Sequence, residues 1–244
     1  MNTIIKPLGR ELRGSKRSWG ILLGIITGFY LFGMAFTAIL MTTVVDDNSY
    51  APLSMLFAQI GAAIALFAMM DRFNGGFDTA VKMGETRRSY LWAAFFTTAL
   101  ELAVMIGFLW LLSLIETGFQ NLFFPGVTVE VDTTVWLQDV KLVLGIVIFV
   151  IGLLSLFGAL LHRYGRKAFW GMWVLWMFAF IVGPRIMDAV EEGNDSVFGH
   201  IGRWLAEVFS SGFGIDVFYI LLGGGVIGVA ASVLLLRRAS VNAT

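Results

Sequence analysis

The sequence predicts an all-α integral membrane protein with six transmembrane helices, and two observations lead to that fold class. The first is a series of six apolar runs of about 20 residues or more, the length that crosses the roughly 30 Å hydrocarbon core of a bilayer. The second is the charge distribution, because most of the 17 lysines and arginines fall in alternate segments between these runs. Cytoplasmic loops carry the excess of basic residues, so both termini are expected in the cytoplasm.

The apolar runs define the expected spans, which are 19–45, 51–70, 91–115, 142–161, 168–187 and 217–236. Basic residues precede the first span, lie between the second and third and between the fourth and fifth, and follow the sixth. They are Lys6, Arg10, Arg13, Lys16, Arg17, Arg72, Lys82, Arg87, Arg88, Arg163, Arg166, Lys167, Arg237 and Arg238. Because the loops are short, residues 1–244 are expected to form a single membrane domain.

Composition excludes several classes of function. Hydrophobic residues make up 58% of the chain and charged residues 14%, against about 25% charged residues in soluble proteins. The absence of cysteine excludes disulfides and thiolate metal sites. No nucleophile, metal or nucleotide-binding motif is present, and no free basic domain exists for nucleic acid. We therefore expect no catalytic residues, no metal and no cofactor bound by this chain.

Three segments outside the spans have a periodic pattern. Residues 4–17 place apolar and basic residues on opposite sides of a helix, which predicts an interfacial helix on the inner leaflet. Residues 127–133 alternate β-branched and polar side chains, which predicts a short strand or hairpin. Residues 188–213 begin acidic and then place apolar residues on one helical stripe. That pattern predicts an amphipathic segment at the outer ends of the spans.

Glycines in the first and last spans are spaced for close packing of helices. They are Gly24, Gly28 and Gly33 in the first span, and Gly223, Gly224, Gly225 and Gly228 in the last. Small residues four apart allow two helix backbones to approach each other. Because this pattern is common in membrane helices, packing within the chain is the expected role.

The cytoplasmic loop between the second and third spans contains a further predicted helix. Phe77–Met83 is long enough for two helical turns, and Gly84 is a natural stop. Phe77, Ala80, Val81 and Gly84 share an apolar face. The simplest interpretation is a short helix resting on the bilayer, and the alternative is an exposed binding surface for another protein.

Glu101 stands near the middle of the third span, and Thr97 lies one turn away on the same face. A charge at that depth costs about 2.5–3.5 kcal/mol on insertion scales. Glu101 must therefore be protonated, paired, or turned toward a wet cavity. One interpretation gives Glu101 and Thr97 a polar contact in a translocation path. The other is a structural glutamate bonded to a neighbouring helix, and the sequence leaves both open.

Residues 77–92 resemble the loop between the second and third spans in permease subunits of type-2 ATP-binding-cassette (ABC) exporters. In that family an apolar helix is followed by a small residue or proline, then Ser or Thr with a basic residue, and then the third span. The matching residues here are Phe77–Met83, Gly84-Glu85, Thr86-Arg87-Arg88 and Tyr90. The Met-Gly-x-Thr-Arg-Arg variant is most similar to small permeases of Gram-positive bacteria, including those that move bacteriocins and antimicrobial peptides.

The resemblance implies partners and a mechanism. Phe77–Met83 would be the coupling helix that docks on a separate ATPase subunit, with two ATPase copies holding ATP and Mg, and 4–17 would help to seat that subunit. The implied coupling residues are Phe77, Ala80, Val81, Met83, Gly84, Arg87 and Arg88. Asp71 or Asp78 would stand in for an acid that the family often carries ahead of this helix. The permease would pair with a second copy or a related permease in the plasma membrane of a bacterium.

On this interpretation the chain exports an amphipathic or hydrophobic substrate, such as an antimicrobial peptide, a drug or a lipid-like molecule. Two other hypotheses remain open. One is an ion- or proton-coupled transporter that uses Glu101, and the other is a membrane scaffold or immunity protein that sequesters a peptide without transport. An ATPase gene beside the permease gene would favour the exporter.

Overall fold

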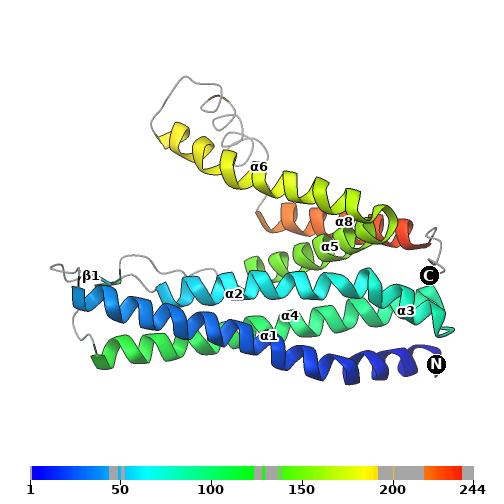
Figure 1. Cartoon of the computed structure of the whole chain (residues 1–244), viewed down its shortest axis with the longest axis horizontal. Helices are drawn as coiled ribbons and strands as arrows, with labels where there is room; N and C mark the ends of the chain where they lie inside the picture. The colour runs from blue at the N-terminus through cyan, green and yellow to red at the C-terminus, as the bar shows by residue number, and fades with distance from the viewer. Residues whose placement is uncertain are drawn as a thin grey trace.

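The computed structural model describes residues 2–43, 49–50, 53–123, 128–129, 137, 139–191, 200 and 217–237. Nearly all of them lie in helices that pack into a bundle (Figure 1). The helices are α1 (Asn2–Thr43), α2 (Leu53–Met70), the 3₁₀ turn η1 (Asp71–Phe73), α3 (Gly75–Lys82), α4 (Arg87–Phe123), α5 (Val140–Tyr164), α6 (Arg166–Glu191) and α8 (Val217–Arg237). Among the described residues, 5 helical stretches are long and apolar enough to cross a membrane: Ser18–Ile39, Leu53–Lys82, Arg87–Phe119, Val140–Tyr164 and Val217–Arg237. The chain is therefore a multi-pass membrane protein by length and composition.

Helix α1 differs from the expected interfacial helix followed by a span. Residues 2–17 are helical as predicted, but α1 continues without a break for 42 residues. At 1.5 Å per residue such a helix is roughly 63 Å long, about twice the hydrocarbon thickness. Residues 4–17 are therefore helical, but they are continuous with the first span and do not form a separate helix. Their position at the inner leaflet stays a prediction.

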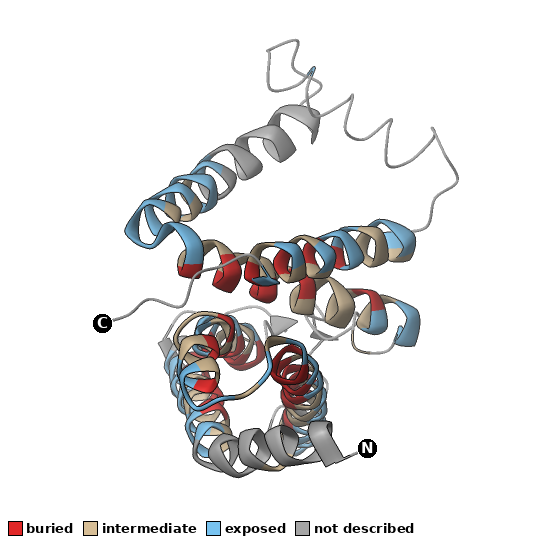
Figure 2. Ribbon diagram, turned by 90° about the vertical axis from the view of Figure 1, so that its right-hand side faces the viewer, coloured by how far each residue is buried: buried red, intermediate tan, exposed pale blue. Residues whose placement is uncertain are grey.

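Helices α1, α2 and α4 form one packed group. Their inner faces bury residues that include Leu22, Ile26, Tyr30, Met55, Ala58, Ala62, Leu102 and Met105. In the end-on view of Figure 2 the buried residues of the lower helices face one another, while exposed residues cover the outside. Gly33 supports this packing, because a Cβ there would lie 2.6 Å from the Cα of Ser54 on α2.

Helices α5 and α8 form a second group around glycines. A Cβ on Gly228 of α8 would lie 2.7 Å from the Gly152 carbonyl oxygen of α5. Gly225 approaches α5 equally closely, at Ile148. Intramolecular packing is thus confirmed for Gly225 and Gly228, and for Gly33 of α1. By contrast, Gly24, Gly28 and Gly223 have nothing within 4 Å of a built Cβ.

Helix α6 leads back along the bundle from the end of α5 and leans away from the other helices (Figure 1). It contains the predicted span 168–187. Several large apolar residues of its first half are exposed, among them Trp170, Trp173, Val174, Leu175 and Phe178. Most of the predicted outer segment 188–213 lies outside the described residues.

The outer loops contribute one short pairing. The strand β1 (Ser49–Tyr50) pairs in parallel with β2 (Thr128–Val129). A strand is therefore present within the predicted segment 127–133, and its partner comes from the loop between α1 and α2. The other residues of that segment are outside the described residues.

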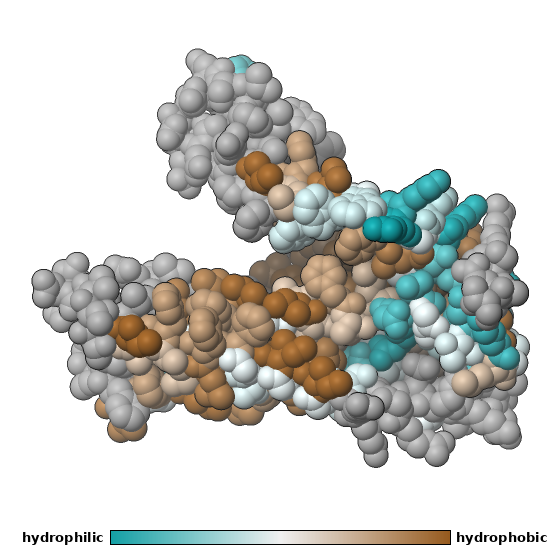
Figure 3. All heavy atoms as spheres, viewed as in Figure 1, coloured by the Kyte–Doolittle hydropathy of each residue, from teal (hydrophilic) through white to brown (hydrophobic). Residues whose placement is uncertain are grey.

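Basic residues gather at one end of the molecule. Figure 3 shows hydrophilic side chains at the right-hand end, over α3 and the neighbouring helix ends, and apolar surface along the rest of the bundle. Two contacts place these segments together: Arg87 at the start of α4 donates to Arg237 at the end of α8. Asp78 of α3 lies beside His162 near the end of α5. We call this region the basic end.

Candidate functional site

Helix α3 is attached to the basic end by its apolar face. Phe77 and Ala80 are both 0% exposed. The Phe77 ring packs edge-on against Tyr90 of α4 at 6.0 Å between centroids, and against His162 of α5 at 5.2 Å. The interpretation of this face as an exposed binding surface is therefore wrong for Phe77 and Ala80, which are buried within the chain. Burying the apolar side chains of this loop against the end of the helix bundle removes them from water, which stabilises the fold.

The outward side of α3 is a different set of residues. Thr79, Lys82 and Gly84 are exposed, and Met83 is 66% exposed. Val81 is half-buried and packs at the edge of the core around Phe77. We call Thr79, Lys82, Met83 and Gly84 the outer face of α3.

The end of α3 has a defined backbone geometry. The Gly84 N–H donates to the Val81 carbonyl at 3.0 Å, and the Glu85 N–H donates to the Ala80 carbonyl at 3.1 Å. Gly84 has a φ of 83°, which L side chains rarely adopt. This pattern of bonds is a Schellman motif. The predicted stop at Gly84 is confirmed, and it holds Met83 on a fixed turn.

The start of α3 is fixed by Tyr90. Its buried hydroxyl donates to the Arg72 carbonyl at 2.7 Å. A Cβ on Gly76 would lie 2.7 Å from the same hydroxyl, so only glycine fits without a shift. Asn74 forms the turn between η1 and α3, while Gly75 and Gly76 already belong to α3.

The two acids near α3 lie in different surroundings. Asp71 is exposed. Asp78 points inward, and its Oδ1 is 3.7 Å from Nε2 of His162, whose side chain is 2% exposed. A charge pair forms there only when His162 is protonated. Asp78 therefore contacts the bundle rather than the outer face of α3.

Arg87 and Arg88 have unequal environments. Arg87 is half-buried and its Nη1 donates to the Arg237 carbonyl at 2.8 Å, which ties the start of α4 to the end of α8. Arg88 is exposed. Arg87 thus has a structural contact within the chain, which the sequence pattern did not predict.

Glu101 is paired with Arg72. Nη1 of Arg72 lies 2.8 Å from Oε2 of Glu101, and Nη2 lies 2.7 Å from Oε1. The indole N–H of Trp19 on α1 also donates to Oε1 at 3.2 Å. The side chains of Arg72 and Glu101 are 11% and 1% exposed. A two-point arginine–carboxylate bond of this kind is the strong form of the interaction, and it joins η1, α1 and α4.

The threonines beside Glu101 are both buried. Thr98 accepts a hydrogen bond from Nη1 of Arg72 at 3.0 Å. Thr97 is 0% exposed, and its hydroxyl has no hydrogen-bond partner among the described residues. Thr97 and Glu101 therefore face the interior of the bundle, not an open cavity among the described residues. Their role in a translocation path remains a prediction.

A second buried carboxylate was not singled out from the sequence. Glu116 of α4 is 3% exposed and accepts a hydrogen bond from the Tyr30 hydroxyl of α1 at 2.9 Å. Like Glu101, it joins α1 to α4. A tyrosine and a carboxylate facing each other from two apolar helices are the signal that sequence reasoning missed.

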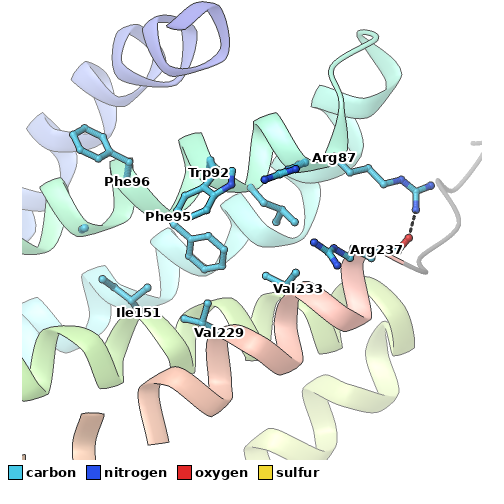
Figure 4. A pocket seen from close by; sticks show the side chains of 11 residues that line it. Arg87, Trp92, Phe95, Phe96, Ile151, Val229, Val233 and Arg237 are labelled. Atoms are coloured by element: carbon cyan, nitrogen blue, oxygen red, sulfur yellow. Dashed lines mark hydrogen bonds between the residues drawn. The ribbon is translucent and has the colours of Figure 1, made fainter. Parts of the chain in front are cut away.

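A groove separates α4 from α8 and α5 (Figure 4). We call it the α4–α8 groove, and its volume is about 690 Å³. Its lining residues are Arg87, Arg88, Leu91, Trp92, Phe95, Phe96, Ala99, Ile151, Val229, Val233 and Arg237. Figure 4 shows Phe95 projecting from α4 toward Val229 and Val233 on α8, with Arg87 and Arg237 at one end. Glu101 and Thr97 are not part of this groove.

The predicted site residues therefore divide into separate places. Phe77 and Ala80 lie in the core beneath α3, Met83 and Gly84 lie on its outer face, and Arg87 and Arg88 lie at the mouth of the α4–α8 groove. Within the described residues, no group of three or more histidines or acids is arranged to hold a metal ion. Arg72 is the main residue that the sequence analysis did not assign to a site. A signal was present, because an acid within a span requires a partner and Arg72 lies two residues after span 51–70.

Comparisons with protein-family models, with curated proteins and with solved structures each find no match for this chain. No relative therefore contributes to the assignment of function.

Proposed function

We propose that this chain is the membrane-spanning subunit of an ATP-driven ABC exporter in a bacterial plasma membrane. It would move an amphipathic or hydrophobic substrate out of the cytoplasm or the inner leaflet, and ATP hydrolysis would reside in a separate subunit present in two copies. A second permease, identical or related, would complete the complex. The observation that carries this proposal is helix α3, mounted at the basic end between α2 and α4.

Six passes fit the positions of the chain segments better than five. The start of α4 and the end of α8 meet through Arg87 and Arg237. Four passes from α4 to α8, with α6 as one of them, would bring these two helix ends to the same side of the membrane, whereas three passes would separate them. With α1 and α2 this would give six spans, and the basic loops favour a cytoplasmic position for both termini.

The construction of α3 suits a coupling element. The buried ring of Phe77 packs against Tyr90 of α4 and His162 of α5. A displacement of α3 by a bound partner would therefore be transmitted to both helices. Its outer face carries Lys82 and the exposed apolar side chain of Met83. An apolar anchor surrounded by polar residues is a common centre of a protein interface. We therefore assign ATPase contact to the outer face of α3 and not to Phe77 or Ala80.

The proton-coupled alternative is less well supported. A carboxylate that carries a proton or an ion must exchange it with water or substrate, and both oxygens of Glu101 are engaged by Arg72. The scaffold or immunity hypothesis has no particular contact in its favour.

The test uses the absence of cysteine from the native chain. A single cysteine in place of Met83 should form a crosslink to an ATPase subunit, identified by mass spectrometry, when cells are treated with a short bifunctional reagent. Lys82→Glu should reduce copurification of that ATPase, because it reverses a charge on the outer face of α3. Lys167→Glu is the matched control, since it reverses an exposed charge at the α5–α6 turn of the same basic end.

The exporter assignment fails if Met83→Cys yields no ATPase crosslink in a strain that expresses the chain with its neighbouring genes. It also fails if Lys82→Glu and Lys167→Glu have equal effects on copurification. The scaffold hypothesis would then be the better description.

A further inference from the structure

The α4–α8 groove joins an apolar channel to a cluster of positive charge. Its walls are aromatic and aliphatic side chains of α4, α5 and α8, and Figure 4 shows Arg87 and Arg237 together at one end, which we call its mouth. Arg88, which follows Arg87 in the first turn of α4, also lines the groove. No acid occurs among its lining residues. A ligand that fills the groove must therefore be apolar over most of its length and anionic at one end.

The length of the groove matches one leaflet of a bilayer. Arg87 and Ala99 are twelve residues apart on α4, which corresponds to roughly 18 Å of helix. Half of the hydrocarbon core is roughly 15 Å thick. The exposed indole of Trp92 lies between these two residues, near the arginines, where aromatic side chains mark the membrane interface.

The arginines have donors available for an anion. Arg87 uses one N–H for the Arg237 carbonyl, and a guanidinium carries five. Arg88 and Arg237 are exposed. Guanidinium groups bind phosphate through paired hydrogen bonds. The backbone contact between Arg87 and Arg237 also holds two of the three guanidinium-bearing residues beside each other at the mouth.

We propose that the α4–α8 groove binds an anionic phospholipid of the cytoplasmic leaflet. The phosphate lies at Arg88 and Arg237, and an acyl chain runs past Trp92 and Phe95 toward Ala99. The choice of leaflet rests on the proposed function, which places the basic end in the cytoplasm. The bound lipid fills the space between α4 and α8 and so connects the α1–α2–α4 group to the α5–α8 group.

The test is native mass spectrometry of the full chain, purified in a neutral detergent. Phosphatidylglycerol and phosphatidylcholine with the same acyl chains are added in separate titrations. We expect retained phosphatidylglycerol at about tenfold lower lipid concentration than phosphatidylcholine. Arg88→Gln with Arg237→Gln should abolish this tenfold preference, because two basic residues near an anionic surface, at roughly fivefold each, account for up to about 25-fold. Arg166→Gln with Lys167→Gln removes two charges from the same end and should keep the preference.

A second variant tests the apolar part. Ala99→Trp fills the inner part of the groove and should weaken retention of both lipids by tenfold or more.

The proposal is overturned if the two lipids bind equally to the native chain, or if the control pair loses as much preference as the groove pair. It is also overturned if inorganic phosphate alone gives the same thermal stabilisation as phosphatidylglycerol. If Ala99→Trp abolishes dimerisation of the chain but leaves lipid retention unchanged, the groove is an interface with a second copy of this chain, and the lipid proposal is overturned. None of these measurements depends on the ATPase, so loss of ATPase docking and loss of lipid binding are distinguishable.

Discussion

Glu101 illustrates how a single charge is accommodated inside an apolar helix. Its two oxygens accept from Arg72, and Trp19 and Thr98 complete the polar cluster. Taking two charges out of water is costly, and a pair of this kind adds little net stability over apolar residues of the same size. Its partners lie on different elements, so the pair fixes where η1 sits against α1 and α4. The energetic consequence appears when one partner is removed.

Arg72→Leu should therefore destabilise the protein by about 3–5 kcal/mol, because it leaves Glu101 as an uncompensated buried charge. Glu101→Leu should also destabilise it, since Arg72 then loses both of its carboxylate bonds. The double variant Arg72→Leu with Glu101→Leu should recover most of the loss. Thermal unfolding in detergent measures this. Additive losses in the double variant would show that the two side chains do not act as a pair, and an ion-carrying role for Glu101 would be open again.

Phe77 provides a second test at the residue scale. It is fully buried beneath α3, so Phe77→Ala should cost about 3–5 kcal/mol of stability through the cavity it leaves. Met83→Ala removes an exposed side chain and should change stability by less than about 0.5 kcal/mol. The comparison uses unfolding of the purified chain without any partner. Equal effects of the two substitutions would contradict the buried position of Phe77. A loss of ATPase binding in a Phe77 variant reports the folding of α3, which is why the docking test uses Met83 and Lys82.

At the scale of the helices, contact between α5 and α8 depends on small residues. Membrane helices gain little from hydrophobic burial against each other, because lipid is as apolar as their side chains, and close packing replaces that driving force. Gly152, Gly225 and Gly228 let the two backbones touch. The adjacent Gly223 does not take part in this contact, since a Cβ on Gly223 would meet nothing within 4 Å. A Cβ on Gly224 would meet the Phe149 ring of α5 at 3.2 Å.

Gly228→Ala should thus destabilise the α5–α8 pair by about 1–3 kcal/mol, as overpacking of a tight contact does. Gly223→Ala should be neutral or slightly stabilising, because alanine favours helix by about 0.5–1 kcal/mol over glycine. Thermal unfolding of the two variants under the same conditions provides the comparison. The same loss in both would mean that α8 packs through a different face.

For the whole molecule, the critical question is whether α6 crosses the membrane. In the proposed orientation, six passes would place Ser240 in the cytoplasm. If α6 stays on one side, the chain would make five passes and Ser240 would lie outside. Exposed aromatic side chains along its first half, such as Trp173 and Phe178, are consistent with a helix surrounded by lipid.

Single cysteines in the cysteine-free chain test this directly. With six spans, cysteines at Asn48, Asp132 and Asn194 should react with an impermeant thiol reagent in intact cells. Cysteines at Ser15, Thr86 and Ser240 should react only after the cells are opened. Labelling of Ser240→Cys in intact cells would reject six spans, and reversal of the whole pattern would reject the assignment of the basic end to the cytoplasm.

The sequence by itself determined the membrane class, the positions of five membrane-length apolar helices, the gathering of basic residues at one end, and the stop of α3 at Gly84. These follow from local composition and backbone preference, because bilayer thickness sets helix length and glycine adopts the positive φ of that turn without strain. Only the tertiary structure decided which face of α3 is buried, which basic residue forms an ion pair with Glu101, and where a groove remains between α4 and α8. Those features depend on side chains from helices far apart in the chain. Arg72 and Glu101, or Arg87 and Arg237, acquire their partners only when the bundle brings the helix ends together.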